Sequence, residues 1–120
     1  MENNENLLPN NEDESKISID DFSKIKLIVA KVIDCEKIKK SKKLLKLILN
    51  DGNSERTVVS GISEYYLPSE LIGHNIVLVS NLKPVKFCGV ESNGMILAAK
   101  HNEILKVIII DEIPPGSIIS

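Results

Sequence analysis

The chain has 120 residues, of which 42% are hydrophobic, 27% are charged and 3% are aromatic. This length and composition predict one small domain with an aliphatic core and exclude a wholly disordered chain. No apolar run approaches the roughly 20 residues of a membrane helix, and the acidic residues 1–5 do not resemble a signal peptide, so we expect a cytoplasmic protein.

The net charge of −2 combines two unlike parts of the chain. Residues 1–21 contain seven acidic residues and one lysine, whereas residues 22–120 contain 14 basic and 10 acidic residues. Residues 1–20 are also rich in Asn and poor in apolar side chains, which predicts a disordered acidic linker or tail. The folded domain is therefore expected over residues 21–120, either as a free-standing protein or as a piece of a longer one.

Apolar residues from Phe22 onward are mostly β-branched and occur in short runs between turn signals, which is typical of strands. A hairpin turn is expected at Asp51-Gly52, because glycine tolerates a positive φ. A short helical stretch interrupted by Pro68 is expected over residues 62–72, and a long loop over residues 81–94. We predict five strands, at residues 25–34, 44–50, 55–60, 75–80 and 95–99.

Five short strands with one helix after the third predict an all-β fold, a five-stranded oligonucleotide/oligosaccharide-binding (OB) barrel. The apolar residues beyond the fifth strand exceed what such a barrel needs, so we expect an appended dimerisation region at residues 101–120. Consecutive isoleucines would place apolar side chains on both faces of a strand, which Pro114 and Pro115 would then stop. The residues expected at the dimer interface are Ile108, Ile109, Ile110, Ile118 and Ile119.

Residues that could support catalysis or bind a cofactor or metal are scattered. His74 and His101 lie in expected turns, where histidines are more often solvated than catalytic. Cys35 and Cys88 are too few and too far apart for a disulfide framework or a zinc site, and neither has a His nearby in sequence. Because the sequence contains no phosphate-binding Gly-rich loop, paired-carboxylate motif or HExxH, we predict no cofactor, no metal and no catalytic activity for this chain.

A lysine-rich segment is a better candidate for a functional site. Six lysines, including Lys42 and Lys43, occur within residues 37–46. A solvated strand edge often carries such lysines, so this segment alone favours nucleic-acid binding no more than it favours that simpler role.

The expected loop at residues 81–94 is the second candidate. It contains Lys83 and Lys86, whose charges are suited to phosphates. Ser92 and Asn93 offer neutral hydrogen bonds, whereas an ordinary hairpin with an Asn-Gly turn is the alternative explanation. Gly94 and Met95, which follow, offer close backbone approach and an adaptable apolar contact.

The most distinctive part of the chain runs from residue 80 to residue 99. It reads Ser-Asn-Leu-Lys-Pro-Val-Lys and, after two further residues, Gly-Val-Glu-Ser-Asn-Gly-Met-Ile-Leu-Ala-Ala. This pattern, together with residues 21–25, 43–47 and 56–62, resembles the tRNA-binding domain at the C-terminus of bacterial methionyl-tRNA synthetases. The same domain occurs in free-standing structure-specific tRNA-binding proteins and in cytokine-like synthetase cofactors. Residues 115–119 resemble the end of the dimer-forming bacterial type.

The resemblance implies an OB barrel that forms a homodimer and holds folded tRNA by shape and phosphate contacts, without catalysis. In the synthetase, such a module raises the tRNA affinity of a separate catalytic body. The residues carried over as RNA contacts are Asn81, Lys83, Lys86, Ser92, Asn93, Gly94 and Met95, to which the lysine-rich segment adds Lys42 and Lys43.

The sequence departs from the family pattern at four positions. Ile28 and Cys88 stand where the family often has Arg, whereas Lys39 and Lys42 replace a usual Pro and Asp. Positive charge is therefore expected to be redistributed over the surface. A dimeric protein-binding or chaperone-like module on the same barrel is the alternative function.

Overall fold

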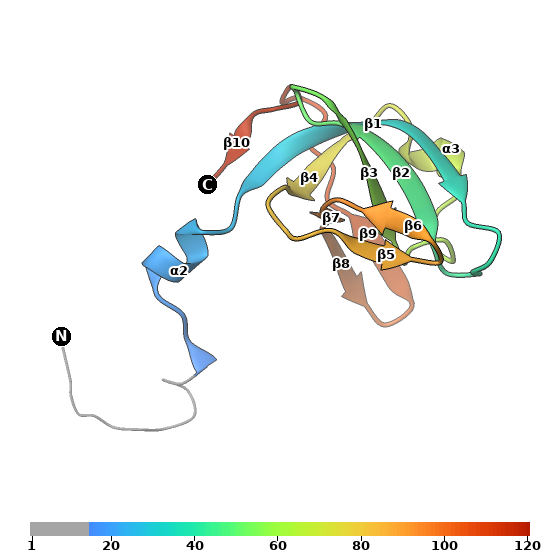
Figure 1. Ribbon diagram of the computed structural model, residues 1–120, viewed down its shortest axis with the longest axis horizontal. Helices are drawn as coiled ribbons and strands as arrows, with labels where there is room; N and C mark the ends of the chain where they lie inside the picture. The colour runs from blue at the N-terminus through green and yellow to red at the C-terminus, as the bar shows by residue number, and fades with distance from the viewer. Residues whose placement is uncertain (1–14) are drawn as a thin grey trace.

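The computed structural model describes residues 15–120 of the chain (Figure 1). Helix α2 (Ile19–Ser23) begins after Ser18, whose hydroxyl accepts a hydrogen bond from the Asp21 N–H at 3.0 Å. The expected boundary between tail and domain at residue 20 therefore falls inside this helix. The earlier part of the expected tail, residues 1–14, lies outside the described residues. No helix in the described part of the chain is long and apolar enough to cross a membrane.

Strands form most of the regular secondary structure in the rest of the described chain, as expected. A four-residue helix, α3 (Pro68–Leu71), follows the third strand. The strands are β1 (Leu27–Lys37), β2 (Leu45–Asn50), β3 (Glu55–Ser60), β4 (Asn75–Val79), β5 (Val85–Phe87), β6 (Val90–Ser92), β7 (Met95–Ile96), β8 (Ala98–His101), β9 (Ile104–Val107) and β10 (Ile118–Ile119).

The main sheet has the order β3-β2-β1-β4-β7, with β10 also paired to β1, and every pairing is antiparallel. The first half of β1 pairs with β4, and residues from Lys31 onward pair with β2, with a register shift between Val32 and Asp34. Such an irregularity bends a strand, and Figure 1 shows the sheet curled into a barrel-like shape. The predicted all-β, OB-like barrel is confirmed.

Three local expectations are wrong. The segment 81–94 is not a simple loop, because it contains the hairpin formed by β5 and β6. The strand expected at 95–99 is divided at Leu97, since β7 pairs with β4 whereas β8 pairs with β9. The helix expected over 62–72 is confined to α3, because Pro68 holds the preceding residue Leu67 in an extended conformation, with ψ 146°.

The core is formed by alternate residues of the central strands. Leu45, Leu47 and Leu49 of β2 are fully buried and pack with Ile76 and Leu78 of β4. Burying one leucine side chain contributes about 1.5–3 kcal/mol, so the three leucines of β2 offset a substantial part of the entropy lost on folding. An aliphatic core is thus sufficient for this small barrel.

The C-terminal segment forms backbone hydrogen bonds with both central strands, β4 and β1. All five residues of β4 are buried, although alternation would leave every second one exposed. Ile110 N–H donates to the Asn75 carbonyl at 2.8 Å, and Gly116 N–H donates to the Val29 carbonyl at 2.7 Å. Part of the apolar surplus noticed in the sequence is buried within the chain itself, since Val107 belongs to the core.

Candidate nucleic-acid interface

The β5–β6 hairpin carries the exposed lysines of the predicted site. It forms a separate two-stranded sheet that crosses the front of the barrel beside β3 (Figure 1). Lys86 lies opposite Glu91 across the hairpin, while Val85 lies opposite Ser92 on the other face. Lys83 and Lys86 are both exposed. The hairpin thus carries charged side chains on one face and the apolar Val85 and Phe87 on the other, where they are 53% and 40% exposed.

The turn of this hairpin consists of Cys88 and Gly89, with φ of 51° and 81°. Positive φ at both central positions is typical of the tight turns whose twist matches that of the flanking strands. The Cys88 side chain is exposed, so the substitution of a larger residue there meets no core packing.

The segment that follows the hairpin closes the barrel. The Ser92 side chain is buried; its hydroxyl accepts a hydrogen bond from Val59 N–H at 2.9 Å and donates to the Gly94 carbonyl at 3.2 Å. Asn93 N–H donates to the Thr57 carbonyl at 2.8 Å. A hydroxyl and an amide therefore join this segment to β3 where no strand pairing does so.

Glycine is required at position 94 by packing. Its φ is +133°, and a Cβ built there would lie 2.8 Å from Leu78 Cδ1 and 3.0 Å from the Val79 carbonyl oxygen. The close approach that the sequence predicts at Gly94 is thus directed at β4 of the same chain.

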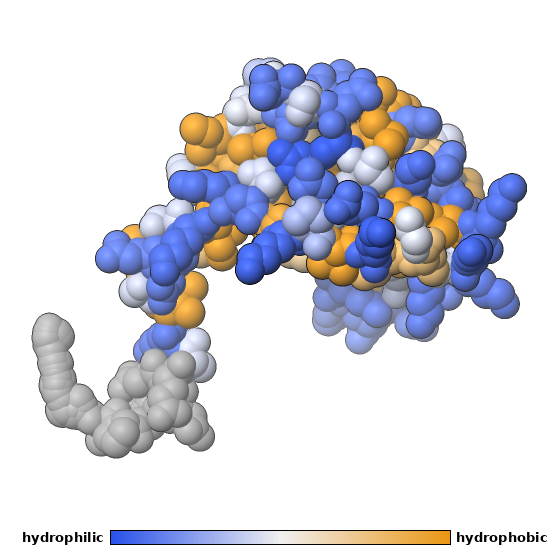
Figure 2. Space-filling model, in the orientation of Figure 1, coloured by the Kyte–Doolittle hydropathy of each residue, from blue (hydrophilic) through white to orange (hydrophobic). Residues whose placement is uncertain are grey.

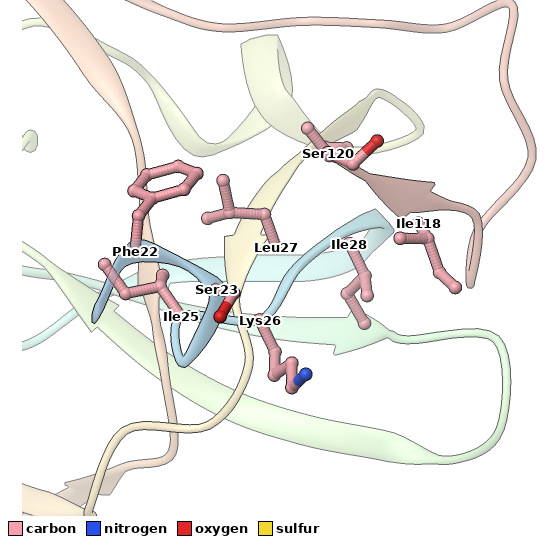
Figure 3. Close-up of a pocket in the computed structure, with 9 residues that line it drawn as sticks. Phe22, Ser23, Ile25, Lys26, Leu27, Ile28, Ile118 and Ser120 are labelled. Carbon is pink, nitrogen blue, oxygen red and sulfur yellow. The ribbon is translucent and has the colours of Figure 1, made fainter. Parts of the chain in front are cut away.

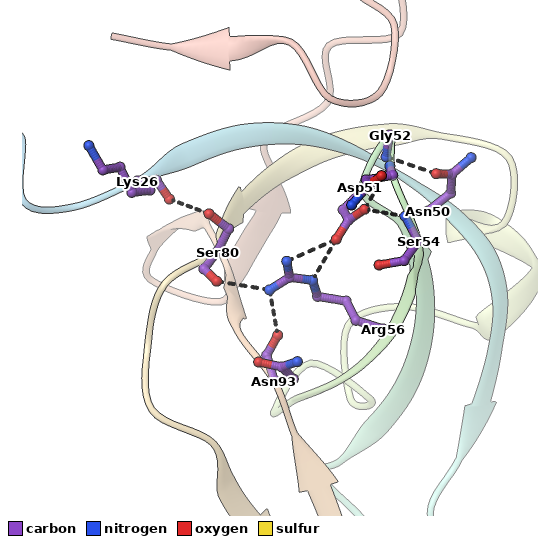
Figure 4. Close-up of polar contacts among 9 residues, drawn as sticks. Lys26, Asn50, Asp51, Gly52, Ser54, Arg56, Ser80 and Asn93 are labelled. Atoms are coloured by element: carbon purple, nitrogen blue, oxygen red, sulfur yellow. Dashed lines mark hydrogen bonds and ion pairs between the residues drawn. The ribbon is translucent and has the colours of Figure 1, made fainter.

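Arg56 connects three parts of the barrel (Figure 4). Its Nε and Nη2 donate to Asp51 Oδ2 at 3.1 and 2.9 Å, and its Nη1 donates to the carbonyls of Ser80 at 2.9 Å and Asn93 at 3.1 Å. These carbonyls lie at the two ends of the segment that contains the hairpin. Both charged side chains are largely buried, with exposed fractions of 17% for Arg56 and 7% for Asp51.

The Asp51 carboxylate is held in its ionised form. Burial disfavours the charge, but hydrogen bonds from the N–H groups of Ser54 and Asn53, together with Arg56, outweigh burial and lower the pKa of Asp51 below its ordinary value. The sequence gives no direct signal for this ion pair, because Asp51-Gly52 is fully explained as a turn.

Asn81 connects the start of the same segment to the residues between α2 and β1. Its Oδ1 accepts a hydrogen bond from Lys26 N–H at 2.9 Å, and its Nδ2 donates to the Lys24 carbonyl at 2.6 Å. The side chain of Asn93, in contrast, is exposed. Met95 is 47% exposed and lines a hollow of about 170 Å³ together with Lys83 and Phe87. Some of the predicted RNA-contact residues are therefore engaged in hydrogen bonds within the chain, whereas others are exposed to solvent.

This barrel, with its exposed basic hairpin, matches a known family. Residues 27–117 fit the family model described as "Putative tRNA binding domain". The chain belongs to this tRNA-binding domain family. The resemblance inferred from the sequence is thereby confirmed.

Relatives of this tRNA-binding domain include a much longer enzyme. The methionine–tRNA ligase of Thermotoga maritima is 50% identical over 109 residues, which are 90% of this chain and 17% of that protein. The chain thus spans about a sixth of the length of the curated relatives it matches.

Two solved structures share the fold over 88% of this chain. A MetRS related protein from Pyrococcus horikoshii is 42% identical, with a TM-score of 0.84 over 99% of that chain. A CsaA chaperone protein from Picrophilus torridus is 27% identical, with a TM-score of 0.81 over 100% of that chain.

The second basic segment of the tRNA-binding domain lies beside the hairpin turn. Lys42 and Lys43 are exposed in the loop between β1 and β2. Other lysines of this loop line a cleft together with Cys88, so tertiary structure brings the two basic segments together. Sequence reasoning assigned no contact to Lys39 or Lys40 in this cleft, although the density of lysines was a visible signal.

The expected dimerisation residues fall into two groups. Ile109 bridges to Ile76 on the side of β4 that faces away from β1, and Ile108 N–H donates to the Leu97 carbonyl at 3.1 Å. Ile118 and Ile119 pair with β1 on its opposite edge. Strands β1 and β4 therefore separate the two groups.

The second group lies next to an apolar hollow (Figure 3). This hollow has a volume of about 350 Å³ and is lined by Phe22, Ile25, Leu27, Ile28 and Ile119, among others. Ile118, which also lines it, is 83% exposed. The N-terminal helix and the C-terminal strand thus form one apolar surface.

Cys35 and His74, two side chains of potentially reactive type, lie against neighbouring groups of the fold. Cys35 is buried, and burial, followed by the charges of Asp34 and Glu36, raises its pKa to about 11. His74 Nδ1 lies 2.8 Å from Asp111 Oδ2. The Asn75 N–H first, and then His74, lower the pKa of Asp111. Within residues 15–120, no group of three or more His, Cys, Asp or Glu side chains is placed to hold a metal ion.

Proposed function

We propose that this tRNA-binding domain holds folded tRNA through its shape and its phosphates and does not itself catalyse a reaction. The observation that carries the proposal is the family match over residues 27–117. Within this range, exposed lysines lie on or next to a hairpin whose two flanking segments are hydrogen-bonded to the barrel. Double-stranded RNA is recognised by shape, phosphates and 2′-hydroxyls. Stacking along a single strand is less suited to this chain, because only 3% of its residues are aromatic.

The internal hydrogen bonds support a division of roles within the proposed site. Lys83 and Lys86 would contact phosphates, with the Asn93 side chain and Met95 beside them. Asn81, Ser92 and Gly94 would instead position the hairpin, because their polar atoms or their backbones are engaged inside the barrel. Lys42 and Lys43 would extend the basic surface into the β1–β2 loop.

The relatives support a further proposal about the origin of the chain. About half of its residues are identical to a segment that makes up 17% of a methionine–tRNA ligase. We propose that the chain is the dimerising C-terminal part of such a ligase and raises the tRNA affinity of a separate catalytic body. The acidic residues 1–20 would then be the linker to that body.

A tRNA titration across a salt series tests the proposed binding. Each phosphate contact should contribute about 0.7 to 0.9 to the log–log salt slope, so affinity should fall steeply with salt. Several tRNA species should bind similarly, and an unstructured single strand of equal length should bind less tightly. Equal affinity for the single strand would contradict recognition by shape.

The alternative function predicts a different result in the same assay. The chaperone-like relative suggests a protein-binding module, which would bind an unfolded polypeptide and show little salt-dependent affinity for tRNA. Binding of polypeptide without binding of tRNA would favour that alternative.

We also propose that two copies of the chain associate through the surface around Ile118. An isoleucine that is 83% exposed, next to an apolar hollow with Phe22 and Ile25, is typical of a surface that another protein covers. A two-fold axis would place the same surface on both copies. Ile108 and Ile109, each less than half exposed, would contribute less.

Sedimentation of two matched variants tests this interface. Ile118→Asp should convert the dimer to a monomer at micromolar concentration. Ile104→Asp removes another isoleucine that is 60% exposed, on the β8–β9 hairpin, and should leave the dimer intact. A monomeric wild-type chain would contradict the proposed dimer, and a dimeric Ile118→Asp variant would place its interface elsewhere.

A further inference from the structure

A basic cleft lies between the β1–β2 loop and the turn of the β5–β6 hairpin. Its volume is about 350 Å³, and its charged lining consists of Lys37, Lys39, Lys40, Lys46 and Glu36. Cys88, at the hairpin turn, lines the opposite side. In Figures 1 and 2 this is the end of the molecule farthest from α2, where hydrophilic side chains project.

The cleft carries uncompensated positive charge. Its one acidic side chain, Glu36, lies 4.0 Å from Lys46 Nζ and neutralises that lysine. Within residues 15–120, Lys37, Lys39 and Lys40 form no ion pair. Cations that share a concave surface reinforce one another's field, so the cleft attracts anions more strongly than the same lysines would on a flat surface.

The lysines project from an ordered turn. Ile38 is largely buried, and its N–H donates to the Leu44 carbonyl at 3.2 Å, while Ser41 N–H donates to the Ile38 carbonyl at 3.1 Å. A fixed turn loses less conformational freedom on binding, which favours affinity. The geometry is therefore suited to a ligand that carries several negative charges.

We propose that this cleft binds backbone phosphates of the same tRNA that the hairpin lysines contact. The RNA-binding surface would then run from Lys86, two residues before Cys88, past the hairpin turn to Lys39 and Lys40. This inference rests on the proposed function, since it adds a second phosphate site for the same ligand. It assigns contacts to lysines outside the segment that carries the family's most distinctive residues.

Cys88 provides a direct probe of the cleft. The whole chain contains two cysteines, and the other one, Cys35, is buried with its pKa raised to about 11. Because the thiolate is the reactive form, alkylation at pH 7.5 reports on Cys88 alone. Mass spectrometry of the full chain therefore measures whether the cleft is open or covered.

The first experiment compares the rate of iodoacetamide alkylation with and without tRNA. At a tRNA concentration of about 100 times the Kd, fixed by a separate titration with labelled tRNA, alkylation should slow at least about tenfold. An unchanged rate in a chain that has bound tRNA overturns the inference and leaves the proposed function intact. Absence of binding in the titration itself contradicts the proposed function.

The second experiment tests whether phosphates occupy the cleft. The double variant Lys39→Ala/Lys40→Ala should lower the salt slope by about 1.4 to 1.8 and weaken binding about tenfold or more at 0.1 M salt. The control Lys16→Ala/Lys24→Ala removes the same number of charges on either side of α2, at the opposite end of the molecule and outside the lining of the apolar hollow, and should have little effect. A wild-type slope in the first variant, or equal losses in both, overturns the inference.

Discussion

The two parts of the segment from residue 80 to residue 95 differ in how they are held. At its two ends, backbone and side-chain atoms form hydrogen bonds to β3, to Arg56 and to the residues between α2 and β1. Between these two ends, the β5–β6 hairpin pairs only with itself within the named strands, and Lys86 on it and Lys83 just before it are exposed. Substitutions at the fixed ends should therefore change stability, whereas substitutions on the hairpin should change RNA affinity.

The largest effect is expected for Arg56→Met. This change leaves the buried Asp51 carboxylate without its cation and two carbonyls without their donor, and breaking such a buried pair costs about 3–5 kcal/mol. The free energy of unfolding in urea measures the loss. A cost below about 1 kcal/mol, the ordinary worth of a surface pair, would show that Arg56 does not fix the ends of the segment.

The pH dependence of stability should change in the same variant. Because the pKa of Asp51 is lowered in the folded state, its carboxylate stabilises the fold above the ordinary pKa of about 4, and this contribution is lost as the pH falls through the folded pKa. Without Arg56 the folded pKa rises. Urea unfolding between pH 3 and pH 7 should therefore show a smaller loss of stability on acidification than in the wild type, because the folded and unfolded pKa values of Asp51 are then closer together.

Gly94→Ala should cost about 2–4 kcal/mol, since it combines backbone strain at positive φ with overpacking against β4. Two glycines serve as controls in the same unfolding assay. Gly61→Ala meets no atom within 4 Å and should be nearly neutral, whereas Gly89→Ala has a φ of +81° without close neighbours and isolates the cost of backbone strain. Equal losses at positions 89 and 94 would exclude a packing role for Gly94.

Ser92→Ala should destabilise the fold by about 1–2 kcal/mol, because it leaves the buried Val59 N–H without an acceptor. At a temperature where the variant is fully folded, its tRNA affinity should equal that of the wild type. If affinity falls while thermal stability is unchanged, the Ser92 hydroxyl contacts RNA and the division of roles is wrong.

Lys86→Ala should weaken tRNA binding by about 1 kcal/mol, several-fold in affinity, and lower the salt slope by nearly one unit. The unfolding free energy should stay within about 0.5 kcal/mol of the wild type, as for most exposed substitutions. Glu91→Gln, directly across the hairpin, should have the opposite effect on affinity, because it removes a negative charge beside the RNA backbone. Cys88→Arg, at the exposed turn, should also strengthen binding.

The sequence was sufficient to locate the main strands. The alternation of Leu45, Leu47 and Leu49 predicts β2, and all three side chains are fully buried. The hairpin of β5 and β6 was missed because its strands have three residues each, too few for an apolar pattern, and contain Lys86 and Glu91. The strand predicted at 95–99 is too long. The chain changes its pairing partner from β4 to β9 at Leu97, and this change has no local signal in the sequence.

By itself, the sequence determined the all-β fold, the family and the two basic segments, because these depend on residue type and short-range spacing. Only the tertiary structure decided the role of each polar side chain. The Ser92 hydroxyl bonds to a residue 33 positions away, and Asn81 bonds to one 55 positions away. A hydroxyl or an amide can bond equally well to a distant backbone or to RNA, so only the folded arrangement shows which polar groups are engaged and which remain exposed.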